Sequence, residues 1–210
     1  MSKRLTNLKR EIGTLRQQFL PDPFNPLGVY PKPTRVQAHT RAFLVLSHAE
    51  IESFFEEWAR EIARASEVVW LSSNKITEPL GFLLATLADR IEIPVTLVGP
   101  NIKDSPTRLA EASVNLFQRY YKQINANHGI KEKNVLGLLA PLGLPSAAVG
   151  STLLPNLDYL GALRGTHAHN SAKAVLSWLD PETEYKRVTD LVSELLVLDQ
   201  WLVAYKRRIR

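Results

Sequence analysis

Residues 41–58 read RAFLVLSHAEIESFFEEW and form the longest helical pattern in the first half of the chain. Apolar side chains recur here at the three- and four-residue spacing of an amphipathic helix, with acidic residues between them. We therefore expect a helix over about 35–65. Its expected core-facing stripe comprises Phe43, Leu46, Phe54, Trp58 and Ile62.

The rest of the chain shows the same helical spacing. Capping residues followed by proline mark the start of several helices, as at Thr77, Ser105 and Asp180. The short apolar run 94–99 has no second strand to pair with, so we interpret it as a loop. The sequence therefore predicts an all-α protein, an up-and-down helical bundle. The other expected helices cover 3–20, 78–92, 105–127, 131–140, 145–153, the region around 157–179, and the chain from Pro181 onward.

Five prolines between residues 21 and 33 exclude regular structure and predict a stiff connector. We expect two parts: an N-terminal amphipathic helix with this connector over 1–34, and a helical bundle over 35–210. With 210 residues and 45% hydrophobic content, the chain is long enough for one sizeable core. The helix over 3–20 needs a surface to pack on, and as an arm it would reach a second protomer.

Residues 164–169 read RGTHAH, and the leucines at 157, 160 and 163 lead into them. An arginine keeps its charge at any working pH and offers a planar fork of donors to phosphate oxygens. A histidine exchanges a proton near neutrality. Together they suit RNA cleavage, in which the 2′-hydroxyl attacks the adjacent phosphorus and no metal is required. The polar residues gathered here are Arg164, Thr166, His167, His169 and Asn170.

The motif RGTHAH and the segment 41–58 resemble the HEPN domains, small helical bundles whose nuclease members carry Arg, four to six residues, then His. The segment 41–58 is similar to the long early helix of the RiboL-PSP type of HEPN protein. In that family two protomers pack so that both motifs line one cleft. The resemblance implies that Arg164 holds the scissile phosphate and His169 transfers protons, with no cofactor.

The same resemblance implies further roles and partners. Supporting roles would fall to Thr166, His167, Asn170 and Glu50, the last of these orienting an imidazole or the arginine. Family members often serve as toxins or antiviral effectors, so RNA, a second copy of the chain and an antitoxin or other controlling partner are expected. The chain departs from many active members in having Gly165 directly after the arginine, where they carry a polar side chain.

Helix geometry constrains the motif independently of the family. In a straight α-helix, residues 164 and 169 would lie about 140° apart, whereas residue 167 would lie near the arginine. Either His167 is the working histidine, or the helix is broken or only beginning near Gly165, whose missing Cβ permits a distortion. We favour the distortion, because it fits the family's histidine position.

The formal net charge of +5 favours an anionic partner. The predicted RNA contacts are Lys173, Arg119, Lys122, Lys206, Arg207 and Arg208. Two tyrosines between Arg119 and Lys122 suit stacking on unpaired bases. Alternatively, this cluster is a half-buried helix shoulder, the terminal cations are solvated helix ends, and His48 is a helix residue hydrogen-bonded to a neighbour.

The chain contains no cysteine, which excludes disulfides and thiolate chemistry and is compatible with a reducing cytoplasm. Basic residues interrupt the N-terminal helix, so it does not read as a signal peptide. The most apolar region, 135–163, is broken by three prolines, and we expect no membrane span. Neither a phosphate-binding glycine loop nor a metal-binding histidine pair is apparent. We expect a cytoplasmic protein.

Two other functions remain open. HEPN folds also occur without nuclease activity, so a non-catalytic RNA- or protein-binding module is one alternative. A helical assembly protein that never contacts RNA is the other, and the N-terminal helix is its best feature.

Overall fold

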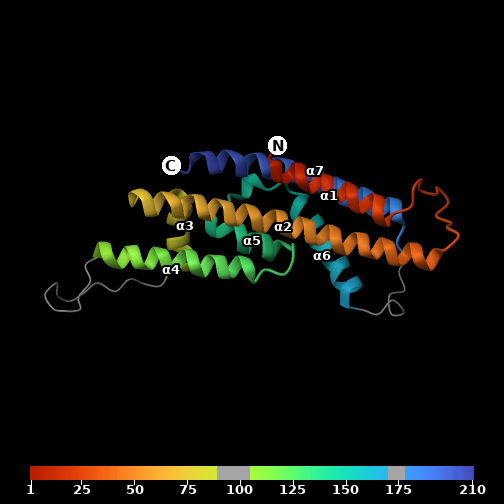
Figure 1. Cartoon of the computed structure of the whole chain (residues 1–210), viewed down its shortest axis with the longest axis horizontal. Helices are drawn as coiled ribbons and strands as arrows, with labels where there is room; N and C mark the ends of the chain where they lie inside the picture. The colour runs from red at the N-terminus through yellow and green to blue at the C-terminus, as the bar shows by residue number, and fades with distance from the viewer. Residues whose placement is uncertain (89–104, 170–177) are drawn as a thin grey trace. The chain divides into compact units, whose positions relative to one another are not determined.

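The structure is a computed structural model, and it describes residues 1–88, 105–169 and 178–210 (Figure 1). Helices account for 79% of the described residues, which contain no strand, and this confirms the predicted all-α fold. The expected loop at 94–99 lies outside the described residues. Among the described helices, none combines the length and the apolar character that spanning a bilayer requires.

Helix α2, Pro33–Ser73, has 41 residues and extends beyond the expected 35–65. Neither proline nor glycine occurs between Pro33 and Pro79, so nothing in this stretch stops the helix. It ends where Asn74 adopts a left-handed conformation with φ of 54°. The Asn74 backbone N–H donates to the Trp70 carbonyl at 2.8 Å.

The expected core stripe of α2 is correct except at Leu46, whose side chain is 39% exposed. Phe43, Phe54, Trp58 and Ile62 are all buried. Residue 46 lies about 140° around the axis from the middle of the buried face, so the apolar pattern there was assigned to the wrong side. The buried positions that replace it include Ser47 and His48.

The described chain forms two compact units, and α2 and α7, Pro181–Arg208, contribute to both. Unit 1 comprises Met1–Phe55, His128–Val135 and Pro145–Ala204. Unit 2 comprises Glu56–Asn127, Leu136–Leu144 and Tyr205–Arg210. This division differs from the expected one at residue 34.

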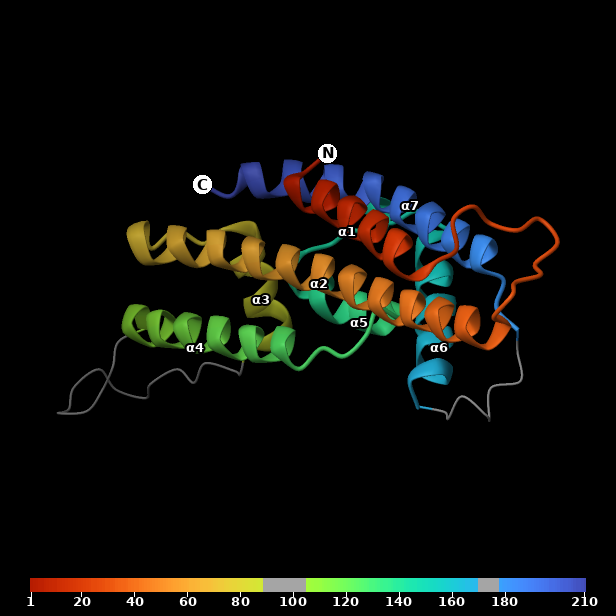
Figure 2. The ribbon, with the colours of Figure 1, turned by 45° about the vertical axis from the view of Figure 1, so that its right-hand side comes forward.

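In unit 1, helix α1, Lys3–Phe19, lies along α7 (Figures 1 and 2). The Ser2 backbone N–H and hydroxyl donate to the two carboxylate oxygens of Asp199 at 2.7 and 2.5 Å. Leu5, Leu8 and Ile12 are buried against the same chain. Helix α1 therefore finds the surface it needs within its own unit, and contact of this helix with a second protomer stays a prediction.

The proline-containing connector also folds back onto unit 1 instead of separating α1 from it. The Arg16 guanidinium lies 4.2 Å from the centroid of the Phe24 ring and 3.2 Å from an Asp22 carboxylate oxygen. The Phe24 ring in turn lies 6.1 Å from that of Tyr185 on α7. A charged side chain and two aromatic rings thus hold the connector in place.

Unit 2 contains the second part of α2 with α3, Glu78–Leu87, and α4, Ser105–Asn125. Helix α3 ends before the expected residue 92, because Ala88 is extended, and residues 89–92 lie outside the described chain. The core of this unit is apolar and aromatic. Its buried side chains include Leu80, Leu83, Leu116, Phe117 and Tyr120.

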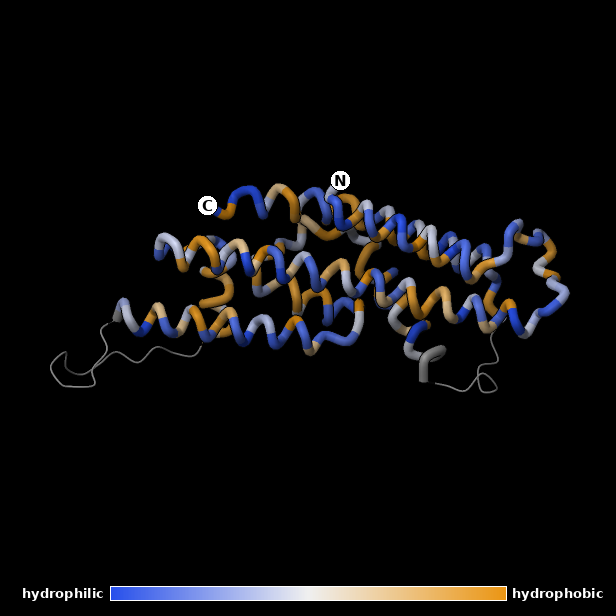
Figure 3. Tube along the Cα trace, in the orientation of Figure 1, coloured by the Kyte–Doolittle hydropathy of each residue, from blue (hydrophilic) through white to orange (hydrophobic). Residues whose placement is uncertain are grey.

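Two predicted helices of the middle region differ in extent from expectation. Helix α5 covers Glu132–Leu139, whereas the expected helix over 145–153 is reduced to a 3₁₀ turn at Ser146–Ala148. A second 3₁₀ turn, Ala140–Leu142, contains a proline and ends at Gly143 with φ of 94°. Figure 3 shows hydrophobic and hydrophilic positions interleaved along α1, α2 and α7, as in amphipathic helices.

Candidate functional site

The arginine of the RGTHAH motif lies on the core-facing side of α6, Leu153–His169. Leu153, Leu157 and Leu160 are at most 1% exposed and define that side. Arg164 follows Leu157 by seven residues, two helical turns, so it shares the same face and is half-buried. The spacing of the leucines therefore turns the guanidinium toward the interior of unit 1.

Contacts with α5 and α7 hold α6 in place. The Asn156 amide donates to both carboxylate oxygens of Glu194 on α7 at 3.0 and 3.1 Å. The Asp158 carboxylate accepts from the Glu132 backbone N–H at 2.6 Å. At Gly161, an added Cβ would lie 2.9 Å from Cγ of Lys131, so the missing side chain permits a close approach to the α5 region.

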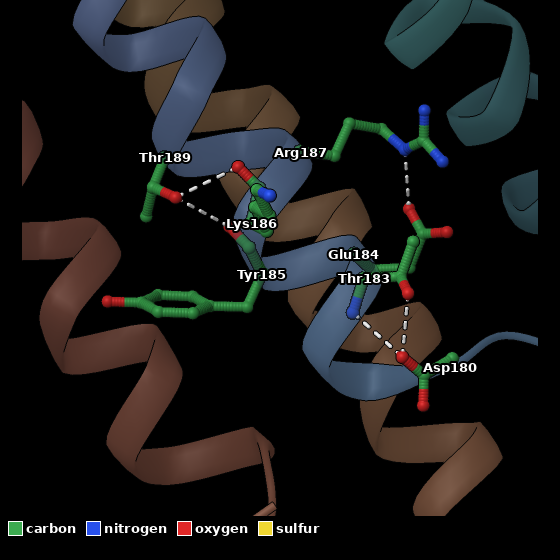
Figure 4. Close-up of polar contacts among 7 residues, drawn as sticks. All are labelled: Asp180, Thr183, Glu184, Tyr185, Lys186, Arg187 and Thr189. Atoms are coloured by element: carbon green, nitrogen blue, oxygen red, sulfur yellow. Dashed lines mark hydrogen bonds and ion pairs between the residues drawn. The ribbon is translucent and has the colours of Figure 1, made fainter. Parts of the chain in front are cut away.

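The first turns of α7 make a further contact with α6, and Figure 4 shows the polar contacts within this part of α7. Asp180 caps α7 by accepting from the Thr183 backbone N–H at 2.8 Å. Glu184 pairs with Arg187 at 3.0 Å, and the Arg187 guanidinium lies 4.4 Å from the centroid of the Tyr159 ring on α6. The capped end of α7 thus supports the helix that carries Arg164.

His48, on α2, is the titratable group that the structure brings next to Arg164. Its side chain is buried, at 2% exposure. Burial, and after it the nearby charge of Arg164, lower the pKa of His48 from 6.5 to about 4. Both causes disfavour the imidazolium, so His48 is neutral at neutral pH.

A carboxylate completes this cluster, and it is Glu52. One of its oxygens lies 3.7 Å from Nδ1 of His48, one helical turn away on α2. That separation is too long for a hydrogen bond, and a neutral imidazole makes no ion pair. The predicted Glu50 is half-buried and lies about 160° around the helix from His48. The His48–Glu52 spacing of four residues was the sequence signal that would have found this pair.

The motif itself lies in an uninterrupted helix. Helix α6 continues through Gly165 to His169, and Gly165 has no positive φ and no atom within 4 Å of the place a Cβ would take. The expected break or distortion near Gly165 is therefore wrong. In this continuous helix, residues 164 and 167 lie about 60° apart around the axis, and residues 164 and 169 about 140° apart.

Some of the remaining predicted site residues lie outside the residues that the structure describes. Thr166, His167 and His169 lie in the last turns of α6. Asn170 and Lys173 lie outside the described residues, as does the apolar segment after the motif. The described chain resumes at Trp178, which is 57% exposed, and at Leu179, which is buried. Gln37 of α2 fixes Leu179 by accepting from its backbone N–H at 2.9 Å and donating to its carbonyl at 2.6 Å.

Four of the predicted RNA contacts are exposed cations of unit 2, which does not contain the motif. Arg119 and Lys122 lie on the exposed side of α4. The tyrosines between them face inward: Tyr120 is fully buried and donates to the Leu138 carbonyl, and Tyr121 donates to Glu67 at 2.6 Å. The proposed stacking role is wrong for Tyr120, because its ring belongs to the core. The alternative of a half-buried helix shoulder describes this cluster better.

The cations at the end of α7 differ from one another. Lys206 is half-buried and pairs with Glu61. Arg208 lies 3.8 Å from Glu78, and its guanidinium lies 5.2 Å from the centroid of the Tyr205 ring. Arg207 is exposed. Three residues that form one basic run in the sequence therefore differ in exposure and in their contacts.

In unit 1 the structure thus brings together Arg164, His48 and Glu52. These residues come from α6 and α2, two helices that are far apart in the sequence. A half-buried guanidinium binds an oxyanion more strongly than an exposed one, because the surroundings screen it less. Comparison with known proteins adds no relative: no protein-family model, no curated protein and no solved structure matches this chain.

Proposed function

We propose that this protein is a metal-independent endoribonuclease in which Arg164 binds the scissile phosphate and His169 transfers protons. The observation that carries the proposal is the position of Arg164, half-buried on the core-facing side of α6, close to His48 of α2. Contacts with α5 and α7 hold the helix that carries it, so the backbone at Arg164 is in place before substrate binds, which favours electrostatic stabilisation of a transition state.

The reaction proposed is transesterification. The 2′-hydroxyl of one nucleotide loses its proton to a histidine and attacks the adjacent phosphorus, and the 5′-oxygen of the next nucleotide leaves with a proton. Arg164 stabilises the additional negative charge on the phosphoryl oxygens. The products are a 2′,3′-cyclic phosphate and a 5′-hydroxyl.

His48 does not fit the proton-transfer role. A pKa of about 4 makes it a weak base at neutral pH and leaves almost none of it protonated to act as an acid. It fits a positioning role beside Arg164. The proton therefore comes from a histidine of the motif.

A dimer reconciles the motif with the continuous helix. Because residues 164 and 169 lie about 140° apart in one helix, a single protomer presents them to different sides. Two copies related by a twofold axis bring Arg164 of one copy to His169 of the other in one shared cleft. In this proposal the protein acts in the cytoplasm as a toxin or antiviral effector under a controlling partner.

The test is RNA cleavage by the purified protein in EDTA. We expect wild-type protein to cleave single-stranded RNA to cyclic-phosphate ends and to leave an all-deoxy oligonucleotide of the same sequence intact. His169→Gln is expected to lower the rate by at least about 100-fold with unchanged helical content. Cleavage that requires added metal, or that proceeds equally on DNA, would exclude the proposed mechanism.

The second candidate is a non-catalytic RNA- or protein-binding module. It is favoured by the continuity of α6 across Gly165, which keeps Arg164 and His169 on different sides of one chain. In the same assay this candidate predicts salt-sensitive RNA binding without any cleavage product.

A further inference from the structure

Unit 2 contains a small cavity between the start of α3 and the end of α7. Its volume is about 160 Å³. This is close to the size of a cavity that holds a benzene molecule of six heavy atoms, about 150 Å³. A phosphate group has five heavy atoms and fits such a space. The residues that define the cavity are Lys75, Glu78, Pro79, Tyr205, Arg208 and Arg210.

The charged side chains around the cavity are mostly cationic. Lys75, Arg208 and Arg210 line the cavity together with one acidic side chain, that of Glu78. Arg208 lies 3.8 Å from Glu78, which is an ion-pair distance but too long for a hydrogen bond. The Arg208 guanidinium donors are therefore not occupied by that carboxylate.

The walls of the cavity are firmly held. Tyr205 is 1% exposed and its hydroxyl donates to the Leu142 carbonyl at 2.5 Å. Its ring supports the Arg208 guanidinium at 5.2 Å. At the opposite wall, the buried hydroxyls of Thr77 and Ser66 hydrogen-bond to each other at 2.5 Å. The cavity is thus shaped by buried groups, and the cations stand at its edge.

We propose that this cavity binds a terminal phosphate, the dianion of a phosphomonoester. Three cations against one carboxylate suit a group that carries a charge of about −2 at neutral pH. An arginine fork matches two phosphate oxygens at once, and lysine adds a point charge. The volume is sufficient for one phosphate group. The proposal is independent of the ribonuclease reaction and involves neither Arg164 nor His169, although Arg208 is also one of the predicted RNA contacts.

Binding of inorganic phosphate to the full chain, measured by calorimetry at low salt, tests the site. We expect Arg208→Gln and Lys75→Gln each to weaken binding roughly fivefold. Arg207→Gln is the matched control. It removes the same charge at the neighbouring residue, whose side chain does not line the cavity. Glu78→Gln removes the only carboxylate side chain at the cavity among the described residues and is expected to tighten binding by a similar factor.

Equal weakening by Arg207→Gln and Arg208→Gln would overturn the proposal, because a diffuse basic tail behaves that way. So would weaker binding in Glu78→Gln, or no binding of phosphate at millimolar concentration. The source of the phosphate is then distinguished with 2′-O-methyl oligonucleotides, which cannot be cleaved. If the site takes RNA ends, a 5′-phosphorylated strand should bind more tightly than its 5′-hydroxyl form, and Arg208→Gln should abolish this difference. If the site takes a small metabolite, the two strands should bind equally, and a free nucleoside monophosphate should still bind.

Discussion

The guanidinium of Arg164 on α6 lies near the buried imidazole of His48 on α2, and its positive charge helps to keep that imidazole neutral. More than a hundred residues of sequence separate the two side chains. A neutral imidazole beside a permanent cation avoids the repulsion that two charges would produce in a buried place. The arrangement places a neutral imidazole, rather than a second cation, beside Arg164.

The neutral state of His48 predicts a stability that falls in acid. The folded-state pKa of about 4 lies below the ordinary value of 6.5, so the unfolded chain binds a proton first as the pH falls. The free energy of unfolding should therefore decrease between pH 6.5 and 4, by up to about 3 kcal/mol from this group. Urea unfolding of wild type and His48→Gln at pH 7 and 4.5 measures this. We expect a smaller acid loss in the variant.

His128→Gln is the control for that comparison, because it removes a histidine that is exposed. It should retain the wild-type dependence on pH. If His48→Gln and wild type lost the same stability between the two pH values, His48 would not be held neutral by the fold.

Removing the charge of Arg164 should raise the pKa of His48. In Arg164→Gln the Coulombic cause is gone, but the larger cause, burial, remains. The pKa of His48 should therefore rise and stay below 6.5. Titration of the His48 ring protons by NMR checks this. Arg187→Gln, which removes a half-buried arginine that stacks on Tyr159, is the comparison and should leave the His48 titration unchanged.

Sequence patterns predicted the helices well because their causes are local. Apolar spacing and capping residues such as Asp180 act within a few residues, and the helix that starts at Pro181 is present. The pairing of helix faces is not local. The burial of α1 on α7 and the approach of His48 to Arg164 depend on packing between distant segments. The sequence alone gives no information on what α2 contacts, so it predicts for His48 only a hydrogen bond to a neighbour on its own helix.

At Gly165 a local signal, the glycine itself, predicts a distortion that the structure does not contain. A glycine in a motif suggested a distortion, but α6 is regular there and the space beside Gly165 is open. Gly165→Ala should therefore stabilise the protein by roughly 0.5–1 kcal/mol, through the better helix propensity of alanine. Thermal and urea unfolding measure the change. Destabilisation instead would mean that the motif requires a conformation that alanine does not adopt.

Gly143→Ala is the matched variant with the opposite expectation. Gly143 has φ of 94°, and an added Cβ would lie 2.5 Å from the Phe82 ring. Both the backbone conformation and the contact oppose a side chain there, so we expect a loss of more than about 1 kcal/mol. The two variants together test whether Gly143 has a left-handed backbone conformation while Gly165 lies in a regular helix.

The shared cleft of the proposed nuclease predicts complementation between two inactive variants. In homodimers, Arg164→Gln and His169→Gln should each lower RNA cleavage at least about 100-fold. When the two variants are co-expressed with different tags and mixed dimers are purified, the shared cleft contains two Arg164–His169 pairs across the twofold axis, and in one of these pairs Arg164 from one copy and His169 from the other are both intact. Mixed dimers should then recover roughly half of the wild-type rate, since one of two equivalent sites is complete.

His167→Gln distinguishes this arrangement from a site within one protomer. Residue 167 lies on the same side of α6 as Arg164, so a site built from a single chain would use His167 and would not be restored by mixing. In that case His167→Gln would be as inactive as Arg164→Gln, and mixed dimers of Arg164→Gln with His169→Gln would lack the predicted recovery. Restored cleavage in the mixed dimers, with His167→Gln retaining most of its activity, is the result that the continuous helix and the dimeric cleft require together.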